Sequence, residues 1–254
     1  MIYAVGDIHG HFDKLRAAHA LIEIDKRVNP SPKATVIHIG DLCDRGPETS
    51  KVIQYLIDGI AKGEDWLVLK GNHDQMFLDF LAGGDGTNPR LSGGASWLGT
   101  TLGGQSTLAS YGAKKSLLES RDAFHRRARA AVPDDHEAFL RDLPVWLRAE
   151  GKIFVHAGIR PGFPIEAQDE TDLLWIRDDF LWHFGDHEAL IVHGHTPVED
   201  PTHYGNRLNI DTGAGWGNPL VPVVLDGERC YALRTGGREE IQVPKQRPKP
   251  VRRR

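Results

Sequence analysis

Two carboxylates and an arginine stand close together at residues 40–46, which read GDLCDRG. Asp41 and Asp44 supply the carboxylates and Arg45 the guanidinium. The apolar run before them, residues 34–39, predicts a buried strand, so these charged side chains follow a strand end. In open α/β sheets, ligands bind just outside the carboxyl ends of the strands. Because charged groups are costly in a core, this set suits a site that holds metal ions and phosphate.

Four further segments place similar side chains after predicted strands. They are GDIHG at 6–10, GNHD at 71–74, HAG at 156–158 and GHT at 194–196. Taken singly, each has an ordinary structural explanation, such as a turn, a helix cap or a buried histidine. Their joint occurrence at five strand ends, in order along the chain, favours one common metal site. Its candidate oxygen and nitrogen ligands are Asp7, His9, Asp41, Asn72, His156 and His195.

The surrounding pattern predicts an α/β protein. In the first part of the chain the predicted strands are 2–8, 34–39 and 66–69, and the predicted helices are 12–27, 48–62 and one beginning at 75. Further along, the predicted strands are 145–148, 152–156, 189–193, 207–211, 221–225 and 229–233. An α/β half followed by a strand-rich half indicates two packed sheets flanked by helices.

Between these halves lies a glycine-rich stretch, residues 83–112, followed by helical patterning that ends at 142. Long irregular stretches inside a domain are usually functional loops. We interpret 83–142 as an insertion that faces the substrate, within a single domain spanning 1–240. Residues 241–254 are basic and proline-rich, so we expect a peripheral, flexible tail.

Composition narrows the class of protein. The 254 residues are 40% hydrophobic and 26% charged, as in ordinary globular proteins, and no apolar run is long enough to cross a bilayer. Subtracting the six cations of the tail from the net charge of −4 leaves −10, which disfavours a general nucleic-acid binder. Two cysteines and the absence of a signal-like start predict a cytoplasmic protein, with Cys43 a small buried apolar residue.

Together, the five motifs resemble those of the calcineurin-like metallophosphoesterases. More narrowly, they are similar to the phosphoprotein phosphatase branch, which includes bacterial and phage serine/threonine phosphatases and diadenosine tetraphosphatase relatives. The resemblance spans about residues 1–233. It implies a four-layer αββα sandwich, in which two mixed sheets flanked by helices hold a dinuclear metal centre between them.

The resemblance also distributes the ligands. One divalent cation is then held by Asp7, His9 and Asp41. The second shares Asp41 and is completed by Asn72, His156 and His195, with His193 left outside the ligand set. Pro197 stands where many broader relatives have a further histidine, which leaves one metal with more water. Manganese is favoured, with iron, zinc or cobalt as alternatives. Two such cations can generate a bridging hydroxide that attacks phosphorus in line.

Other residues receive catalytic and binding roles through the same resemblance. His73 would donate a proton to the leaving group, oriented and kept cationic by Asp44. Arg45 would grip phosphate oxygens with both arms of its guanidinium. A second arginine clamp is placed at Arg177, with Arg160 a weaker candidate for the same work.

The favoured function is a metal-dependent phosphomonoesterase that acts on phosphoserine or phosphothreonine. The alternative is an enzyme of the same fold that hydrolyses dinucleoside polyphosphates such as diadenosine tetraphosphate. A non-catalytic metal-binding scaffold is disfavoured, because no ligand or acid of the motif set is missing. The expected partner is therefore a phosphorylated protein or a small phosphoester, with neither a membrane nor a nucleic acid. The sequence does not predict the oligomeric state, and beyond the preference for manganese it does not decide the identity of the metal.

Overall fold

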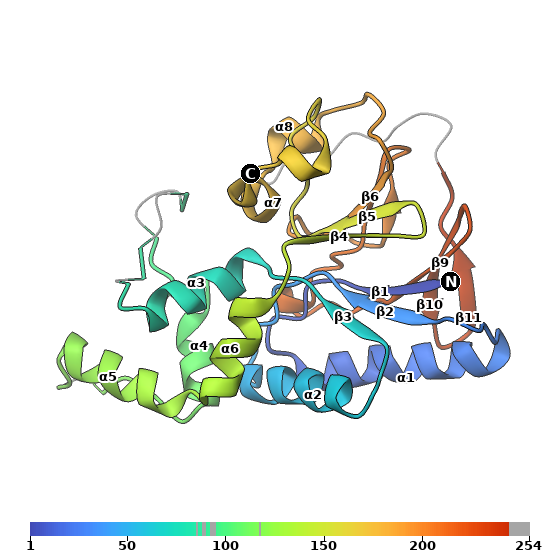
Figure 1. The fold of residues 1–254 in the computed structure, drawn as a ribbon. Helices are drawn as coiled ribbons and strands as arrows, with labels where there is room; N and C mark the ends of the chain where they lie inside the picture. The colour runs from blue at the N-terminus through green and yellow to red at the C-terminus, as the bar shows by residue number, and fades with distance from the viewer. Residues whose placement is uncertain (85, 88–89, 92–94, 117, 244–254) are drawn as a thin grey trace.

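The computed structural model describes all residues except 85, 88–89, 92–94, 117 and 244–254. Two mixed sheets face each other, with helices on the outer side of each (Figure 1). The predicted four-layer αββα sandwich is therefore confirmed. The predicted tail at 241–254 lies outside the described residues from 244 onward.

The first sheet has six strands in the order β11-β10-β9-β1-β2-β3. Strands β1, β2 and β3 are mutually parallel, while β9, β10 and β11 run antiparallel to their neighbours. Their bounds are Ile2–Val5, Thr35–His38, Trp66–Val68, Val223–Asp226, Arg229–Arg234 and Gly237–Glu240, in chain order.

The second sheet has five strands in the order β4-β5-β6-β8-β7. Its three central strands, β5, β6 and β8, are parallel, and the edge strands β4 and β7 are antiparallel to them. The bounds of β4 to β8 are Trp146–Ala149, Lys152–Val155, Leu190–His193, Thr202–His203 and Arg207–Asn209. Both sheets thus contain a parallel unit whose carboxyl ends are available for a site.

Alternation along the strands accounts for the layers. In β1, Ile2 and Ala4 join the core between the sheets, where Phe154 of β5 also packs. The intervening Tyr3 and Val5 point to the other side and join the core beneath the helices. A strand buried on both faces in this way reads as a continuous apolar run, as the sequence does here.

Helices cover the outer faces (Figure 1). The first sheet is covered by α1, Phe12–Val28, and α2, Thr49–Ala61. The second is covered by α7, Glu170–Trp175, and α8, Asp178–Leu181. Four further helices gather at one end of the sandwich: α3, Asn72–Leu81, α4, Gly104–Ser110, α5, Arg121–Ala131, and α6, Asp134–Asp142. Among the described residues, no helix combines the length and the hydropathy that crossing a membrane requires.

Several elements differ from the prediction. Helix α3 begins at Asn72 rather than at 75, so the GNHD motif lies in its first turn. The glycine-rich stretch contains α4, which was not predicted, and neither were α7, α8, β7 and β11. The first residue of α4, Gly104, has no room for a side chain, because a Cβ there would lie 2.4 Å from the ring of Trp97. The glycine that lowers local helix propensity is therefore required by the packing.

Candidate active site

The candidate site lies on the loops after β1, β2, β5 and β6 and, after β3, on Gly71 and the first turn of α3. Backbone strain is concentrated on these loops. Among the described residues, the non-glycine residues with positive φ are His9, Asp41, Asp44, Arg45 and His195, with φ from 49° to 76°, and Glu150, which is not a predicted site residue. This conformation is costly for side chains with a Cβ and persists where the surrounding structure enforces it, commonly at ligand sites.

Two glycines allow the loops to approach one another. A Cβ on Gly71 would lie 2.2 Å from Oδ1 of Asp41, and one on Gly194 would lie 2.2 Å from Oδ1 of Asp7. No other residue would fit at these distances. The glycines of the GNHD and GHT motifs therefore bring the loops after β3 and β6 onto the carboxylates of the loops after β2 and β1.

His9, Asp41 and His73 form one group whose ligand-type atoms all lie within 4.8 Å of one another. Nδ1 of His9 donates to the carbonyl of Cys43 at 2.8 Å. Its Nε2 therefore carries the lone pair and lies 3.4 Å from Oδ2 of Asp41. Asp41 also accepts from the backbone N–H of His73 at 2.9 Å. This tautomer of His9 is the one that could bind a metal on the Asp41 side.

Asp41, His156 and His195 form a second group within the same limit. Nδ1 of His156 donates to the carbonyl of Ile39 at 3.0 Å, so its Nε2 carries a lone pair. That Nε2 lies 2.9 Å from Oδ1 of Asn72, and Nδ1 of His195 lies 2.8 Å from the same oxygen. These side chains converge beside the carboxylate of Asp41, and Nε2 of His195 has no hydrogen-bond partner among the described residues. A divalent cation fits this donor set, since imidazole, amide and carboxylate ligands all bind Mn, Fe, Zn or Co.

The charges of the buried carboxylates support the same fit. Burial raises the pKa of Asp7, and the nearby carboxylates of Asp211 and Asp41 raise it further. Its main hydrogen-bond donor is the backbone N–H of His195, 3.2 Å from Oδ2. Asp7 lies outside both three-residue groups, but a cation between it and Asp41 would reverse the unfavourable charge and hold Asp7 ionised.

His73 and Asp44 form a buried pair beside the first group. Nδ1 of His73 donates to Oδ2 of Asp44 at 2.6 Å. The same carboxylate accepts from Nε1 of Trp97 and from Oγ1 of Thr107, both at 2.7 Å. Nε2 of His73 consequently points away from Asp44, toward the guanidinium of Arg45.

Arg45 lies beside the first group and contacts both of its imidazoles. Its Nη1 donates to Nε2 of His9, and its Nη2 donates to Nε2 of His73 at 3.1 Å. Its Cζ lies 4.5 Å from the ring centroid of Trp216, a side chain that is half exposed. The guanidinium therefore stands where a phosphate bound at the metal centre would meet it.

The two other candidate arginines occupy different places. Nη1 of Arg177 donates to Oγ1 of Thr196 at 3.2 Å, next to His195. Arg177 is exposed, so this contact puts it at the rim of the site. Burial lowers the pKa of His195, and the charge of Arg177 lowers it further. Arg160 instead pairs with Asp172 at 2.7 Å and is largely exposed.

Residues 1–216 match the family model for calcineurin-like phosphoesterases. The chain belongs to this family. The resemblance predicted from the motifs is thereby confirmed, and the protein is a metallophosphoesterase with His/Asp groups suited to divalent metals. Membership of this family implies divalent metals without identifying the element, and the donor atoms described above are those that could bind them.

The similar proteins include nucleotide hydrolases. The chain is 26% identical over 272 residues to a bis(5'-nucleosyl)-tetraphosphatase, PrpE [asymmetrical], of Anoxybacillus flavithermus, covering 98% of this chain and 96% of that one. A symmetrical bis(5'-nucleosyl)-tetraphosphatase of Hamiltonella defensa is 38% identical, but over only 88 residues, or 35% of this chain and 29% of that one. The first of these similarities therefore extends over the whole of both proteins.

Solved structures share the fold. A protein assigned as a diadenosine tetraphosphatase superposes with a TM-score of 0.61 at 19% identity, covering 91% of each chain. A cold-active protein tyrosine phosphatase has the same TM-score at 16% identity, covering 97% of this chain and 80% of that one. At these identities the similarity establishes the architecture alone.

Sequence reasoning missed several residues of this phosphoesterase site. Asp74 accepts from the N–H groups of Gly71 at 2.8 Å and Leu42 at 2.9 Å, which fastens the loop after β2 to the start of α3. Its place three residues after Gly71 is a capping-box signal that could have found it. Asp211, beside Asp7, begins a segment at 211–214 that resembles a family segment near the metals but received no role from the sequence. Trp216, beside Arg45, comes from a distant segment that carries no comparable local signal.

Proposed function

We propose that this metallophosphoesterase hydrolyses dinucleoside polyphosphates. The observation that carries the proposal is the end-to-end similarity to the asymmetrical tetraphosphatase, which covers 98% of this chain. This reading replaces phosphoserine and phosphothreonine, which the sequence alone favoured. The half-exposed indole of Trp216 supports it, because an aromatic ring beside the phosphate clamp offers a nucleobase a stacking surface.

The metals would be held by the residues that the motifs predict. We assign one site to Asp7, His9 and Asp41, and the other to Asp41, Asn72, His156 and His195. When bound, a pair of divalent cations supplies Lewis acidity and a water activated for attack on phosphorus. Manganese as the resident metal, a cytoplasmic location and a single domain over 1–240 stay predictions.

The arginines would bind and orient the polyphosphate. The guanidinium of Arg45, now directed at His9 and His73, would turn its two N–H arms to phosphate oxygens. Arg177 would neutralise charge on a phosphate farther along the chain of phosphates, from its place beside His195. A substrate with several phosphates can use both arginines at once.

His73 would act as the proton donor. Its Nδ1 is committed to Asp44, so only Nε2 can deliver a proton to the leaving oxygen as the phosphorus–oxygen bond breaks. The water that forms the new phosphorus–oxygen bond would lose its own proton to the bulk solvent, which in turn would reprotonate His73 after the leaving group departs. A nucleotide phosphate is a much weaker base than an alkoxide and leaves more easily as an anion. The proposed substrate therefore needs His73 less than a phosphoserine would.

A substrate panel tests the proposal. Metal-stripped protein is re-supplied with Mn, Fe, Zn or Co singly, and diadenosine tetraphosphate, a phosphoserine peptide and p-nitrophenyl phosphate are compared. We expect kcat/KM for the dinucleotide to exceed that for the phosphopeptide by about tenfold or more, a difference of ~1.4 kcal/mol. Chromatography of the products distinguishes ATP plus AMP from two ADP. Preference for the phosphopeptide would overturn the proposal.

A further inference from the structure

The carboxylate of Asp44 is held almost entirely by the 83–142 segment. Oδ2 accepts from Nε1 of Trp97 and Oδ1 from Oγ1 of Thr107, both at 2.7 Å. Oγ1 of Thr107 also accepts from the backbone N–H of Asp44 at 2.8 Å, so this hydroxyl grips the residue from two sides. His73 makes the remaining bond.

These donors meet a physical need. Asp44 is completely buried, and burying a carboxylate is costly unless its oxygens are hydrogen-bonded. Two neutral donors satisfy the charge without competing with the imidazole for a proton. They leave one lone-pair direction on Oδ2 for Nδ1 of His73, and this fixes the ring so that Nε2 faces Arg45.

The segment is built to dock at this point. The indole of Trp97 is 1% exposed and stacks on Phe77 of α3, with ring centroids 5.6 Å apart. A Cβ on Gly104 would strike this indole, and one on Gly103 would lie 2.3 Å from the backbone nitrogen of Arg45. The two glycines therefore let the start of α4 close onto both Trp97 and the loop that carries Asp44 and Arg45.

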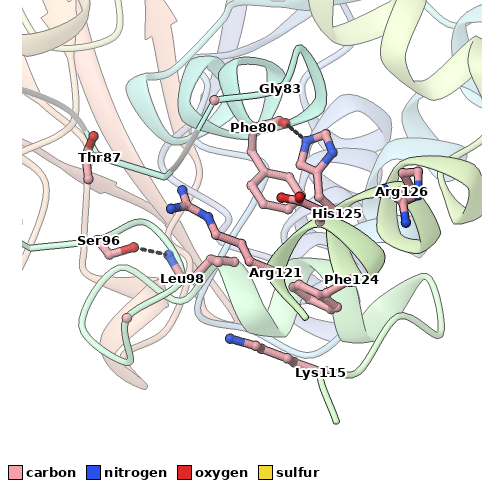
Figure 2. Close-up of a pocket in the computed structure, with 13 residues that line it drawn as sticks. Phe80, Gly83, Thr87, Ser96, Leu98, Lys115, Arg121, Phe124, His125 and Arg126 are labelled. Atoms are coloured by element: carbon pink, nitrogen blue, oxygen red, sulfur yellow. Dashed lines mark hydrogen bonds between the residues drawn. The ribbon is translucent and has the colours of Figure 1, made fainter. Parts of the chain in front are cut away.

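The chain on either side of Trp97 faces a cavity. Ser96 and Leu98 line a space of about 860 Å³ together with Phe80 and Phe124 (Figure 2). The predicted metal ligands do not line this space, and neither do His73, Arg45 and Arg177. Trp97 itself is turned inward, against Phe80 at 5.0 Å and toward Asp44. Its inward orientation is consistent with a role at the active site rather than in this cavity.

We propose that Trp97 and Thr107 are positioning residues for catalysis, which act through Asp44 to aim His73 at the leaving group. This inference rests on the proposed role of His73 as proton donor. The 83–142 segment then completes the acid end of the site, a different role from the substrate-facing loop that its glycine content suggested. Both side chains are buried behind Asp44, so the proposed role needs no contact with the substrate.

The test compares leaving groups rather than total activity. Two esters of the same phosphoryl group are compared, the p-nitrophenyl ester and the methyl ester. The phosphoryl group is taken from the substrate that the panel shows to be turned over best, and both esters are assayed with Trp97→Phe and Thr107→Val. Thr107→Val keeps the side-chain volume and deletes the hydroxyl. Trp97→Phe keeps an aromatic ring at this buried position but is smaller and deletes the N–H donor. We expect kcat for the methyl ester to fall by about 10- to 100-fold, part of what a general acid supplies, and kcat for the p-nitrophenyl ester to fall by about threefold or less.

Matched variants complete the design. Thr107→Ser keeps the hydroxyl and should restore the wild-type ratio of the two esters. Trp66→Phe changes a tryptophan of β3 outside the site and should leave both esters unchanged. If one variant fails to fold, as judged by circular dichroism, the other still decides.

Three outcomes are separable. Selective loss in His73→Asn and in the two variants supports the proposal. Selective loss in His73→Asn alone, with uniform or no loss in Trp97→Phe and Thr107→Val, overturns it and leaves the acid role intact. Uniform loss in His73→Asn overturns the acid role and this inference together. The choice between dinucleotide and phosphopeptide is decided separately, by the panel.

Discussion

Two groups of buried histidines differ in whether every ring nitrogen has a hydrogen-bond partner. Between α1, β2 and α2, Tyr55 donates to Nδ1 of His19 at 3.0 Å, and Nε2 of His19 donates to Nε2 of His38 at 2.9 Å. Nδ1 of His38 then donates to the carbonyl of Leu67 at 3.1 Å. Each ring nitrogen has one partner of the opposite kind, so this group is complete with neutral rings.

In the candidate metal centre the ring nitrogens are not all paired in this way. Nε2 of His156 and Nδ1 of His195 converge on the amide oxygen of Asn72, beside the carboxylate of Asp41. Nε2 of His195 is buried there with no hydrogen-bond partner among the described residues. The comparison teaches that a buried polar group which satisfies itself supports the fold, whereas one with surplus acceptors is built to receive a cation.

The largest effect is expected from a change in the candidate metal centre. Asp41→Asn should lower turnover by about 10³-fold, or ~4 kcal/mol, because the carboxylate belongs to both metal groups. Wild-type protein at a metal concentration of 100 Kd should gain about 2.7 kcal/mol of stability, or roughly 5–10 °C in Tm. The variant should lose this gain in a thermal-shift assay. His19→Gln is the control and should keep it; a metal-dependent gain that survives in Asp41→Asn would contradict the comparison.

His73→Asn separates proton donation from metal binding. Turnover of an alkyl phosphate should fall by about 10²–10⁴-fold, as for loss of a general acid. Turnover of p-nitrophenyl phosphate and of diadenosine tetraphosphate should fall much less, because these leaving groups need less protonation. Metal content, measured by atomic absorption, should not change. Equal losses on all three substrates would remove the acid role.

The hydrogen-bonded pair of His19 and His38 should lower the stability of the protein at acidic pH. Burial lowers the pKa of His38 to about 4, and burial together with His38 lowers that of His19 further. Because both values lie below the ordinary 6.5, the unfolded chain binds these protons first, and the stability present above pH 6.5 is lost as the pH falls. Between pH 7 and pH 5, one such histidine costs about 2 kcal/mol.

Urea unfolding of the metal-free protein checks this. His19→Gln removes one titrating ring, so it should lose about 2 kcal/mol less than the wild type between these two pH values. Turnover at pH 7 should be unchanged. An acid loss identical to that of the wild type would show that the histidine pair does not behave as a closed group.

The smallest effect distinguishes two arginines. Arg45→Ala should raise KM for the dinucleotide by about tenfold, since a charge-assisted bidentate contact is lost. Arg160→Ala, the matched control, should stay within about twofold, because its exposed pair with Asp172 contributes little. Steady-state kinetics on one substrate measures both. Equal changes would place the phosphate elsewhere.

The sequence predicted the strand-end motifs well because each is a local pattern. An apolar run followed by glycine and a polar side chain marks a strand that ends at a tight turn, and β1 and β2 obey it. The glycine-rich stretch was harder to interpret. Gly103 and Gly104 indicate an irregular loop by propensity, yet both are required by close approach to Arg45 and Trp97. Propensity describes a residue alone, and here the tertiary contact prevailed.

The sequence by itself determined the fold class, the family, and the candidate side chains for binding metal and phosphate. Their order along the chain was sufficient, because parallel strands deliver their carboxyl ends to one edge. Only the tertiary structure decided which neighbours complete them. Trp97 and Thr107 reach Asp44 from more than 50 residues away, and Trp216 reaches Arg45 from 171. Contacts at such separations depend on how whole layers pack, and no local pattern in the chain records them.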